Sequence, residues 1–87
     1  MVKGTITIVT PGGLHMRPAG VLCKHATKYL SKIEFKYKDS MINVKSVLSV
    51  LGACICAGEE AELICTGTDE EKAFAELSQL IAGGLSE

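Results

Sequence analysis

The chain has 87 residues, of which 47% are hydrophobic and 22% charged, and its formal net charge is −1. This length is that of one small domain, so we expect residues 1–87 to form a single one. The composition excludes intrinsic disorder, and the chain has no run of about 20 apolar residues that could span a membrane. The opening residues do not form a signal segment, so we expect a cytoplasmic protein without membrane insertion.

Charge is distributed unevenly along the chain. Residues 1–45 contain eight Lys or Arg and two acidic residues, whereas residues 46–87 contain one Lys and eight acidic residues. Nucleic-acid-binding domains usually carry a strong basic excess, which the whole chain lacks. We therefore expect no direct contact with nucleic acid, and we expect the basic half to attract acidic proteins or a small anion.

Four segments alternate between apolar and polar residues, which predicts half-buried strands: 2–10, 32–38, 41–44 and 60–66. Apolar residues at helical spacing predict a first helix that begins at residues 16–18 and includes Leu30 on its apolar face. Ser46 as an N-cap favours a short helix from about residue 47, although the valines there favour a strand. Thr68 and Glu71 form a capping box that predicts a last helix, ended by two glycines.

The element order is therefore β-α-β-β-α-β-α. Strands with one polar face and amphipathic helices pack as two layers, so the pattern predicts an α+β fold with an antiparallel sheet and helices on one side.

Four cysteines occur, at positions 23, 54, 56 and 65. We expect them to be reduced and mostly buried as small apolar side chains. Cys54 and Cys56 form a C-x-C pair without the second pair or nearby His of a zinc site, so we expect no metal and no cofactor. A metal or redox role and incidental exposed thiols are the alternatives.

His15 lies at the start of the predicted first helix, after Gly12-Gly13 and before Arg17. A helix N-terminus presents unpaired N–H groups and a partial positive charge, so it binds phosphate readily. That charge and Arg17 favour a neutral, nucleophilic imidazole, and the guanidinium suits phosphate oxygens. The segment therefore favours a phosphoryl acceptor with a backbone cradle at Met16 and Arg17. The plainer interpretation is a surface histidine beside a solvated arginine.

One nucleophile without a nearby carboxylate does not make a complete hydrolase. The sequence close to His15 offers no such general base. We therefore expect a carrier that partner proteins phosphorylate and dephosphorylate, not an enzyme.

The segment Gly13-Leu14-His15-Met16-Arg17-Pro18-Ala19 resembles the active-site signature of the HPr family. Its members are the histidine-containing phosphocarriers of the bacterial phosphoenolpyruvate:sugar phosphotransferase system. The resemblance covers essentially the whole chain, including its length, the residues at 44–48 and the start of the last helix at 68–71. A lysine–serine–aliphatic motif places Ser46 thirty-one positions after His15, as in the family.

The resemblance implies an open-faced β-sandwich, in which three helices cover a four-stranded antiparallel sheet of order 1-4-2-3. It implies that His15 accepts a phosphoryl group on Nδ1 from enzyme I and passes it to sugar-specific enzyme IIA domains. Arg17 would stabilise that group. The strand order follows from the resemblance alone.

Ser46 is the second candidate site, and its plain interpretation is an N-cap. Val47-Leu48-Ser49 resembles the pattern of family members from low-GC Gram-positive bacteria. That resemblance implies phosphorylation of Ser46 by an ATP-dependent HPr kinase/phosphorylase, and binding of the modified form to a catabolite-control repressor. A helix N-terminus tolerates phosphate, so the modification would act by placing negative charge beside the surface that docks enzyme I.

One helical face carries three apolar residues, Val47, Leu48 and Leu51, which periodicity alone assigns equally well to the core. The resemblance implies an exposed patch here that docks partner proteins. It would be ringed by lysines, whose other interpretation is simple solvation: Lys24, Lys28 and Lys45. We expect a monomer, because no larger apolar interface is indicated.

Two positions depart from the family pattern. Gly12 has no side chain to contact the phosphoryl group, so backbone donors must suffice. Cys54 replaces a usual glycine, and we expect the local turn to differ because left-handed backbone is strained for Cys.

Two other classes of function were weighed. One is a purely regulatory HPr-like interaction protein read through Ser46, without phosphotransfer, and the presence of both His15 and Arg17 argues against it. The other is a small α/β module that binds RNA or a metal. The chain lacks the stacking aromatics and the ligand set that it would need.

Overall fold

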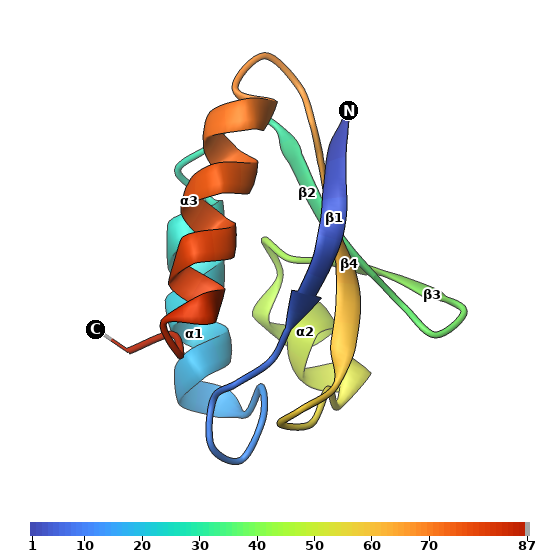
Figure 1. The fold of residues 1–87 in the computed structure, drawn as a ribbon, viewed down its shortest axis with the longest axis vertical. Helices are drawn as coiled ribbons and strands as arrows, with labels where there is room; N and C mark the ends of the chain where they lie inside the picture. The colour runs from blue at the N-terminus through green and yellow to red at the C-terminus, as the bar shows by residue number, and fades with distance from the viewer. Residues whose placement is uncertain (87) are drawn as a thin grey trace.

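The computed structural model describes residues 1–86 and contains seven elements in the predicted order (Figure 1). The four strands are β1 (Val2–Thr7), β2 (Lys32–Tyr37), β3 (Ser40–Asn43) and β4 (Glu60–Thr66). The three helices are α1 (Met16–Ala26), α2 (Val47–Ala53) and α3 (Glu70–Ala82). Among the residues described, no helix has the length and hydropathy needed to cross a bilayer.

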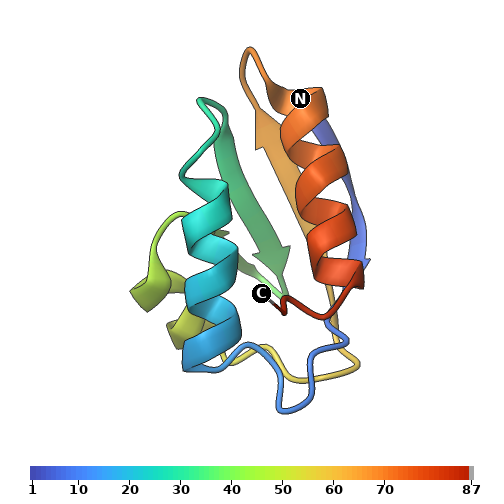
Figure 2. The same cartoon turned by 90° about the vertical axis from the view of Figure 1, so that its left-hand side faces the viewer.

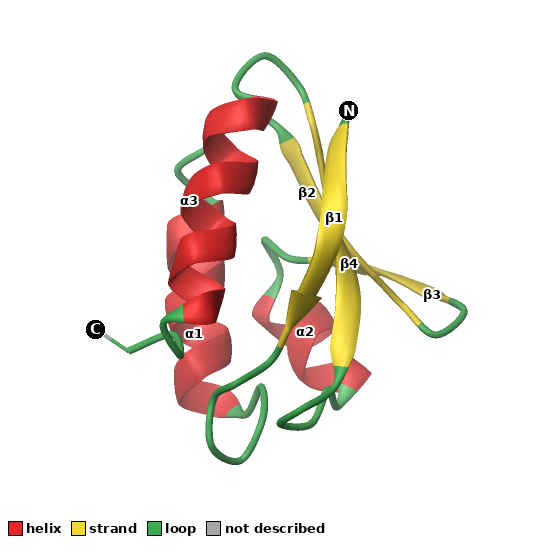
Figure 3. Cartoon of the chain, in the orientation of Figure 1, coloured by secondary structure: helices red, strands yellow, loops and turns green. Residues whose placement is uncertain are grey.

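The strands form one antiparallel sheet of order β1-β4-β2-β3. The helices lie on one face of this sheet, and the opposite face is left open (Figures 1 and 3). Helices α1 and α3 run side by side across the covered face (Figure 2). The α+β class, the open-faced β-sandwich and its strand order are thus confirmed.

The core lies between the sheet and the helices and is mainly aliphatic. Phe35 of β2 and Leu63 of β4 are cross-strand partners and are both fully buried. Leu22 of α1 and Leu77 of α3 belong to the same buried cluster. Burying one side chain of this size contributes about 1.5–3 kcal/mol, so the side of β2 and β4 that carries Phe35 and Leu63 determines which face of the sheet the helices cover.

Two element ends differ from the sequence-based predictions. Strand β1 ends at Thr7 instead of residue 10, because Glu59 N does not return the bond that Ile8 N makes to Glu59 O: it donates to Cys56 O at 3.1 Å, and Ile8 O accepts from Gly58 N at 2.7 Å. Helix α1 ends at Ala26, so Leu30 lies beyond it and is 85% exposed. The hydroxyl of Thr27 donates to Lys24 O at 2.8 Å, a local bond that competes with continuation of the helix.

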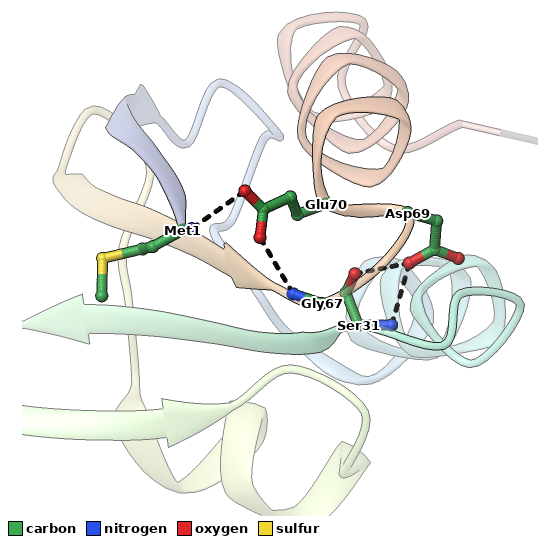
Figure 4. A network of polar contacts seen from close by, with 5 residues as sticks. All are labelled: Met1, Ser31, Gly67, Asp69 and Glu70. Carbon is green, nitrogen blue, oxygen red and sulfur yellow. Dashed lines mark hydrogen bonds and ion pairs between the residues drawn. The ribbon is translucent and has the colours of Figure 1, made fainter.

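The capping box predicted for the last helix is wrong. The N-cap of α3 is Asp69, and its carboxylate makes no capping bond because it reaches across to the turn before β2. It accepts from Leu30 N at 2.9 Å. It also accepts from Ser31 N at 2.9 Å and from the Ser31 hydroxyl (Figure 4). Glu70 replaces Glu71 as the acid that bonds back, accepting from Gly67 N at 3.0 Å.

Gly67 is required where this network brings the two turns together. Its φ is +155°, and a Cβ there would lie 2.7 Å from Ser31 Cα. Glu70 also accepts from the ammonium group of Met1 at 2.9 Å, which ties the start of β1 to the start of α3 (Figure 4). One cluster of hydrogen bonds therefore joins β1, β4, α3 and the α1–β2 turn.

This network predicts a loss of stability in acid. The hydrogen bonds from Ser31, and then from Leu30, hold the pKa of Asp69 below its ordinary value. A lowered folded pKa contributes stability above the unfolded pKa of about 3.9, and that stability is lost as the pH falls through the folded value. Asp69→Asn should unfold more easily at pH 7 and lose less stability between pH 5 and pH 2 than the wild type, as measured by urea unfolding across that range.

Glu71→Gln is the matched control, because Glu71 is the exposed acid that the sequence assigned to the cap. It should follow the wild-type curve at every pH. An Asp69→Asn curve parallel to the wild type, or an equal effect of Glu71→Gln, would contradict the role of Asp69.

Candidate functional site

His15 is the N-cap residue of α1, and its side chain is exposed. Its backbone is extended, with φ −85° and ψ −170°, and its carbonyl accepts the N–H of Ala19 at 2.9 Å. The ring makes no capping hydrogen bond to the helix. The imidazole therefore projects from the helix start with its nitrogens not committed to capping.

A tight turn places His15 there. Gly13 has a φ of +76°, which costs little only for glycine. A Cβ on Gly13 would lie 2.6 Å from Ile55 O and 2.9 Å from Cys56 Cα, so the two backbones touch. Leu14, which is buried, donates its N–H to the same Ile55 oxygen at 3.0 Å. The β1–α1 loop thus rests on residues 54–57, which we call the supporting segment.

The supporting segment is itself anchored. Glu59 accepts from Cys56 N and from the Tyr37 hydroxyl, both at 2.7 Å, and donates its own N–H to Cys56 O at 3.1 Å. The bond from Tyr37, followed by that from Cys56, holds the pKa of Glu59 below its ordinary value. A chain of contacts therefore runs from β2 through Glu59 and the supporting segment to the loop of His15.

The start of α1 can bind an anion beside this ring. The N–H groups of Met16 and Arg17 have no intrahelical acceptor, because they belong to the first turn, and Pro18 has no N–H. No acidic residue lies in that turn. Arg17 is exposed, so its guanidinium is available to oxygens held there.

A hollow of about 280 Å³ opens beside His15. It lies between the β1–α1 loop, the end of α2 and the supporting segment, and seven residues line it: Gly12, Leu14, His15, Leu51, Cys54, Ile55 and Cys56. Leu51 is therefore the member of the predicted docking patch that the structure brings next to His15. The exposed cysteines on its wall were not predicted.

Ser46 is the N-cap of α2, as predicted, and its hydroxyl accepts from Ser49 N at 3.2 Å. Its backbone carbonyl accepts from Val50 N at 3.0 Å. No acidic residue occupies the first turn of α2. Ser46 thus caps α2 in the structure. Its half-buried hydroxyl lies at the positive end of the dipole of α2.

The predicted patch on α2 is divided between the surface and the core. Leu48 is 83% exposed, whereas Val47 and Leu51 are half-buried and pack against the core. The residue of α2 that is fully buried is Val50, which does not belong to the predicted patch. Leu48 is thus the apolar side chain that α2 offers to a partner.

The three candidate lysines differ in their surroundings. Lys24 is exposed on α1, Lys28 is exposed in the turn that follows this helix, and Lys28 Nζ lies 3.5 Å from His25 Nδ1. Lys45 is half-buried and donates to Tyr29 O at 2.7 Å. Lys45 therefore also holds the turn after α1.

The cysteines fall into two pairs, all with free thiols. Cys23 and Cys65 are buried, as expected, and burial raises the pKa of both, that of Cys65 to about 11. The expectation of burial is wrong for Cys54 and Cys56, which are exposed. Residues 1–86 contain no group of three or more metal-binding side chains close enough to hold an ion.

Cys54 does not alter the local turn, contrary to expectation. It ends α2 with φ 54° and ψ 43°, in left-handed backbone. Its N–H still bonds to Leu51 O at 3.2 Å, as a helix end requires. The helix end therefore keeps the left-handed geometry that suits glycine. This geometry is less favourable for Cys54 than for glycine, because Cys54 has a Cβ.

Comparison with known proteins agrees with this geometry. Residues 2–83 match the family model described as the PTS HPr component phosphorylation site. The phosphocarrier protein HPr of Lysinibacillus sphaericus is 37% identical over 75 residues, covering 86% of this chain and 85% of that protein. HPr of Treponema pallidum is 30% identical over 87 residues, covering 100% and 99%.

A solved structure extends the match to three dimensions. The crystal structure of HPr-C-His from Thermoanaerobacter tengcongensis superposes with a TM-score of 0.95 at 32% identity, covering 100% of this chain and 98% of the other. The fold and the sequence agree along almost the entire length. The chain belongs to the HPr family of phosphocarrier proteins.

The contact between Gly13 and the supporting segment can be tested by a matched pair of variants. Gly13→Ala should destabilise the fold by more than the about 1–2 kcal/mol that left-handed backbone costs, because the methyl group must also displace Ile55 O. Gly20→Ala should instead stabilise α1 by roughly 0.5–1 kcal/mol, since no atom within 4 Å would meet the new methyl group. Urea unfolding measures both changes, and a Gly13→Ala variant as stable as the wild type would rule out the close contact.

Proposed function

We propose that this protein carries phosphoryl groups between enzyme I and sugar-specific enzyme IIA domains of the phosphotransferase system, with His15 as the acceptor. Membership of the HPr family supports this role and these partners. The observation that carries the assignment of the residue is the exposed ring of His15 at the N-terminus of α1. The first turn of that helix offers the Met16 and Arg17 N–H groups to phosphate oxygens.

The proposed chemistry uses this arrangement directly. Nδ1 of the neutral ring attacks phosphorus, the N–P bond forms, and the bond to the donor breaks. During phosphoryl transfer, negative charge spreads over the three oxygens of the transferred group. Hydrogen-bond donors positioned around these oxygens stabilise that charge. The two N–H groups and the Arg17 guanidinium supply those donors. The same contacts serve the reverse step, when a partner's nucleophile takes the group from His15.

The protein acts as a carrier and not as a hydrolase. A hydrolase would place a base that activates water beside the phosphohistidine, and no carboxylate lies in the first turn of α1. Glu59 lies on the far side of the supporting segment, where Tyr37 and Cys56 already donate to it. The phosphoryl group therefore remains until a partner removes it.

Incubation with phosphoenolpyruvate and enzyme I should add one phosphoryl group to the chain, lost again on acid treatment because the phosphoramidate is acid-labile. Intact-mass measurement detects both steps. His15→Ala should take up none, whereas His25→Ala, a histidine change on the same helix, should match the wild type. Uptake by His15→Ala, or none by a wild type beside an HPr that the same enzyme I phosphorylates, would refute the assignment.

Partner proteins dock over Leu48, Leu51 and the hollow beside His15 in this proposal. Leu48 is the exposed apolar side chain and Leu51 connects it to the hollow. We propose that basic side chains steer acidic partners towards this patch: Lys24, Lys28 and Lys45.

Ser46 is the proposed site of regulation by an ATP-dependent HPr kinase/phosphorylase, with a catabolite-control repressor as the partner of the modified form. Its position at the start of α2 supports this, because helix N-H groups stabilise a phosphate there. The added charge would lie two residues before Leu48, at the same end of α2, and repel acidic partners. The alternative, a regulatory protein that acts through Ser46 without phosphotransfer, leaves the His15 site unexplained.

The effect of charge can be separated from the effect of capping at Ser46. Ser46→Asp and Ser46→Asn both retain an N-cap side chain, whereas Ser46→Ala should lower the free energy of unfolding by about 1 kcal/mol. Only Ser46→Asp should slow phosphorylation of His15 by enzyme I, and added salt should reduce the difference. Initial rates of phosphoryl uptake measure this, and equal rates for the Asp and Asn variants would contradict the charge mechanism.

A further inference from the structure

Two exposed thiols lie beside His15 and have no part in phosphoryl transfer. Cys54 and Cys56 line the same hollow as the His15 ring. They differ from Cys23 and Cys65, which are buried and have raised thiol pKa values. An oxidant or a modifying reagent in solution therefore meets the two thiols at the site first.

The backbone between these thiols holds the loop of His15. Ile55 O accepts from Leu14 N at 3.0 Å, and Cys56 Cα lies where it would be 2.9 Å from a Cβ on Gly13. A rearrangement of residues 54–56 must therefore move the β1–α1 loop or break its hydrogen bond.

The two thiols are also within reach of each other. Residues two apart span at most about 7 Å even when the chain is extended, and the Cα atoms of a disulfide are usually 4.4–6.8 Å apart. The left-handed turn at Cys54 shortens the distance, and Cys56 Sγ lies 3.5 Å from Cys54 O. Cys54 Sγ lies 3.6 Å from Leu51 O, so each thiol contacts a backbone oxygen and both side chains must leave these contacts for the sulfurs to join.

We propose that Cys54 and Cys56 form a thiol–disulfide switch that turns off phosphoryl transfer at His15, an inference that rests on the proposed carrier function. A hydroperoxide is the oxidant. One thiolate attacks the peroxide oxygen, which gives a sulfenic acid and releases water or an alcohol. The second thiol attacks the sulfenic sulfur, the S–S bond forms and water leaves, so the protein loses two hydrogens and two electrons. A dithiol reductant reverses the step by exchange.

The disulfide acts through the supporting segment. The ring that it closes contains the Ile55 peptide units, so the Ile55 carbonyl turns away from Leu14 N and from Gly13. His15 then loses its position relative to the Met16 and Arg17 N–H groups. A misplacement of about 1 Å at a reacting group costs up to roughly 10²-fold in rate, so oxidation should slow phosphoryl uptake by roughly 10- to 100-fold.

The test treats the whole chain with one equivalent of hydrogen peroxide. Intact mass should fall by two hydrogens, and peptide mapping should link Cys54 to Cys56 while Cys23 and Cys65 remain reduced. The rate of His15 phosphorylation by enzyme I is then measured before oxidation, after it, and after addition of a dithiol reductant. We expect slow uptake only in the oxidised sample.

The matched control is the double variant Cys54→Ser/Cys56→Ser, which retains the exposed Met16 and so reports any effect of methionine oxidation. Its rate should be unchanged by peroxide. A linked Cys54–Cys56 peptide with unchanged uptake, failure of the link to form, or equal inhibition of the double variant would each overturn the proposal.

A second readout separates this proposal from the carrier function. The amide signals of Gly13 and Leu14 in a ¹H–¹⁵N spectrum should move on oxidation of the wild type and not of the double variant. If the reduced protein takes up no phosphoryl group, the carrier function fails, whereas the amide signals still report whether the disulfide displaces the loop. Unmoved signals in a fully oxidised sample would overturn the switch itself.

Discussion

The Ile55 carbonyl accepts the N–H of Leu14 at 3.0 Å, and the same oxygen packs against the backbone of Gly13. These contacts place the β1–α1 loop at the end of the covered face of the sheet. Glu59 stabilises these contacts, because its carboxylate accepts hydrogen bonds from Cys56 N and from the Tyr37 hydroxyl of β2. The position of His15 thus depends on the sheet through a short series of backbone contacts, and little of it depends on the His15 side chain.

This support explains how a chain of 87 residues can hold a reactive site on an exposed loop. The helix start supplies N–H donors without any side-chain machinery, and the first turn of α1 contains no acidic residue to compete with phosphate. The Asp69 and Glu70 network lies at the other end of α3 and β4, far from the β1–α1 loop (Figure 1). At the end that holds His15, the Glu59 carboxylate is engaged by Cys56 N and the Tyr37 hydroxyl, and the first turn of α1 remains free to receive an anion.

Most of the fold could be predicted because its elements are strongly periodic. Strand β4 ends where the alternation of apolar residues ends, and Ser46 caps α2 as its position indicated. The capping box failed because Thr68 and Glu71 are a local pattern, whereas Asp69 is engaged by the distant Ser31. The exposure of Cys54 could not be predicted either. Its spacing of four residues from the buried Val50 indicates the core side of a helix, but α2 ends at Ala53 and Cys54 lies beyond it in left-handed backbone.

The central claim is that the start of α1 holds a phosphoryl group on Nδ1 of His15. The most direct measurement is a ³¹P and ¹⁵N NMR study of the chain after phosphorylation by enzyme I. The account predicts ³¹P coupling to Nδ1 of His15, together with downfield shifts of the Met16 and Arg17 amide protons as they bond to phosphate. Phosphate on Nε2 or on another residue, or unshifted amide protons at these two positions, would contradict it.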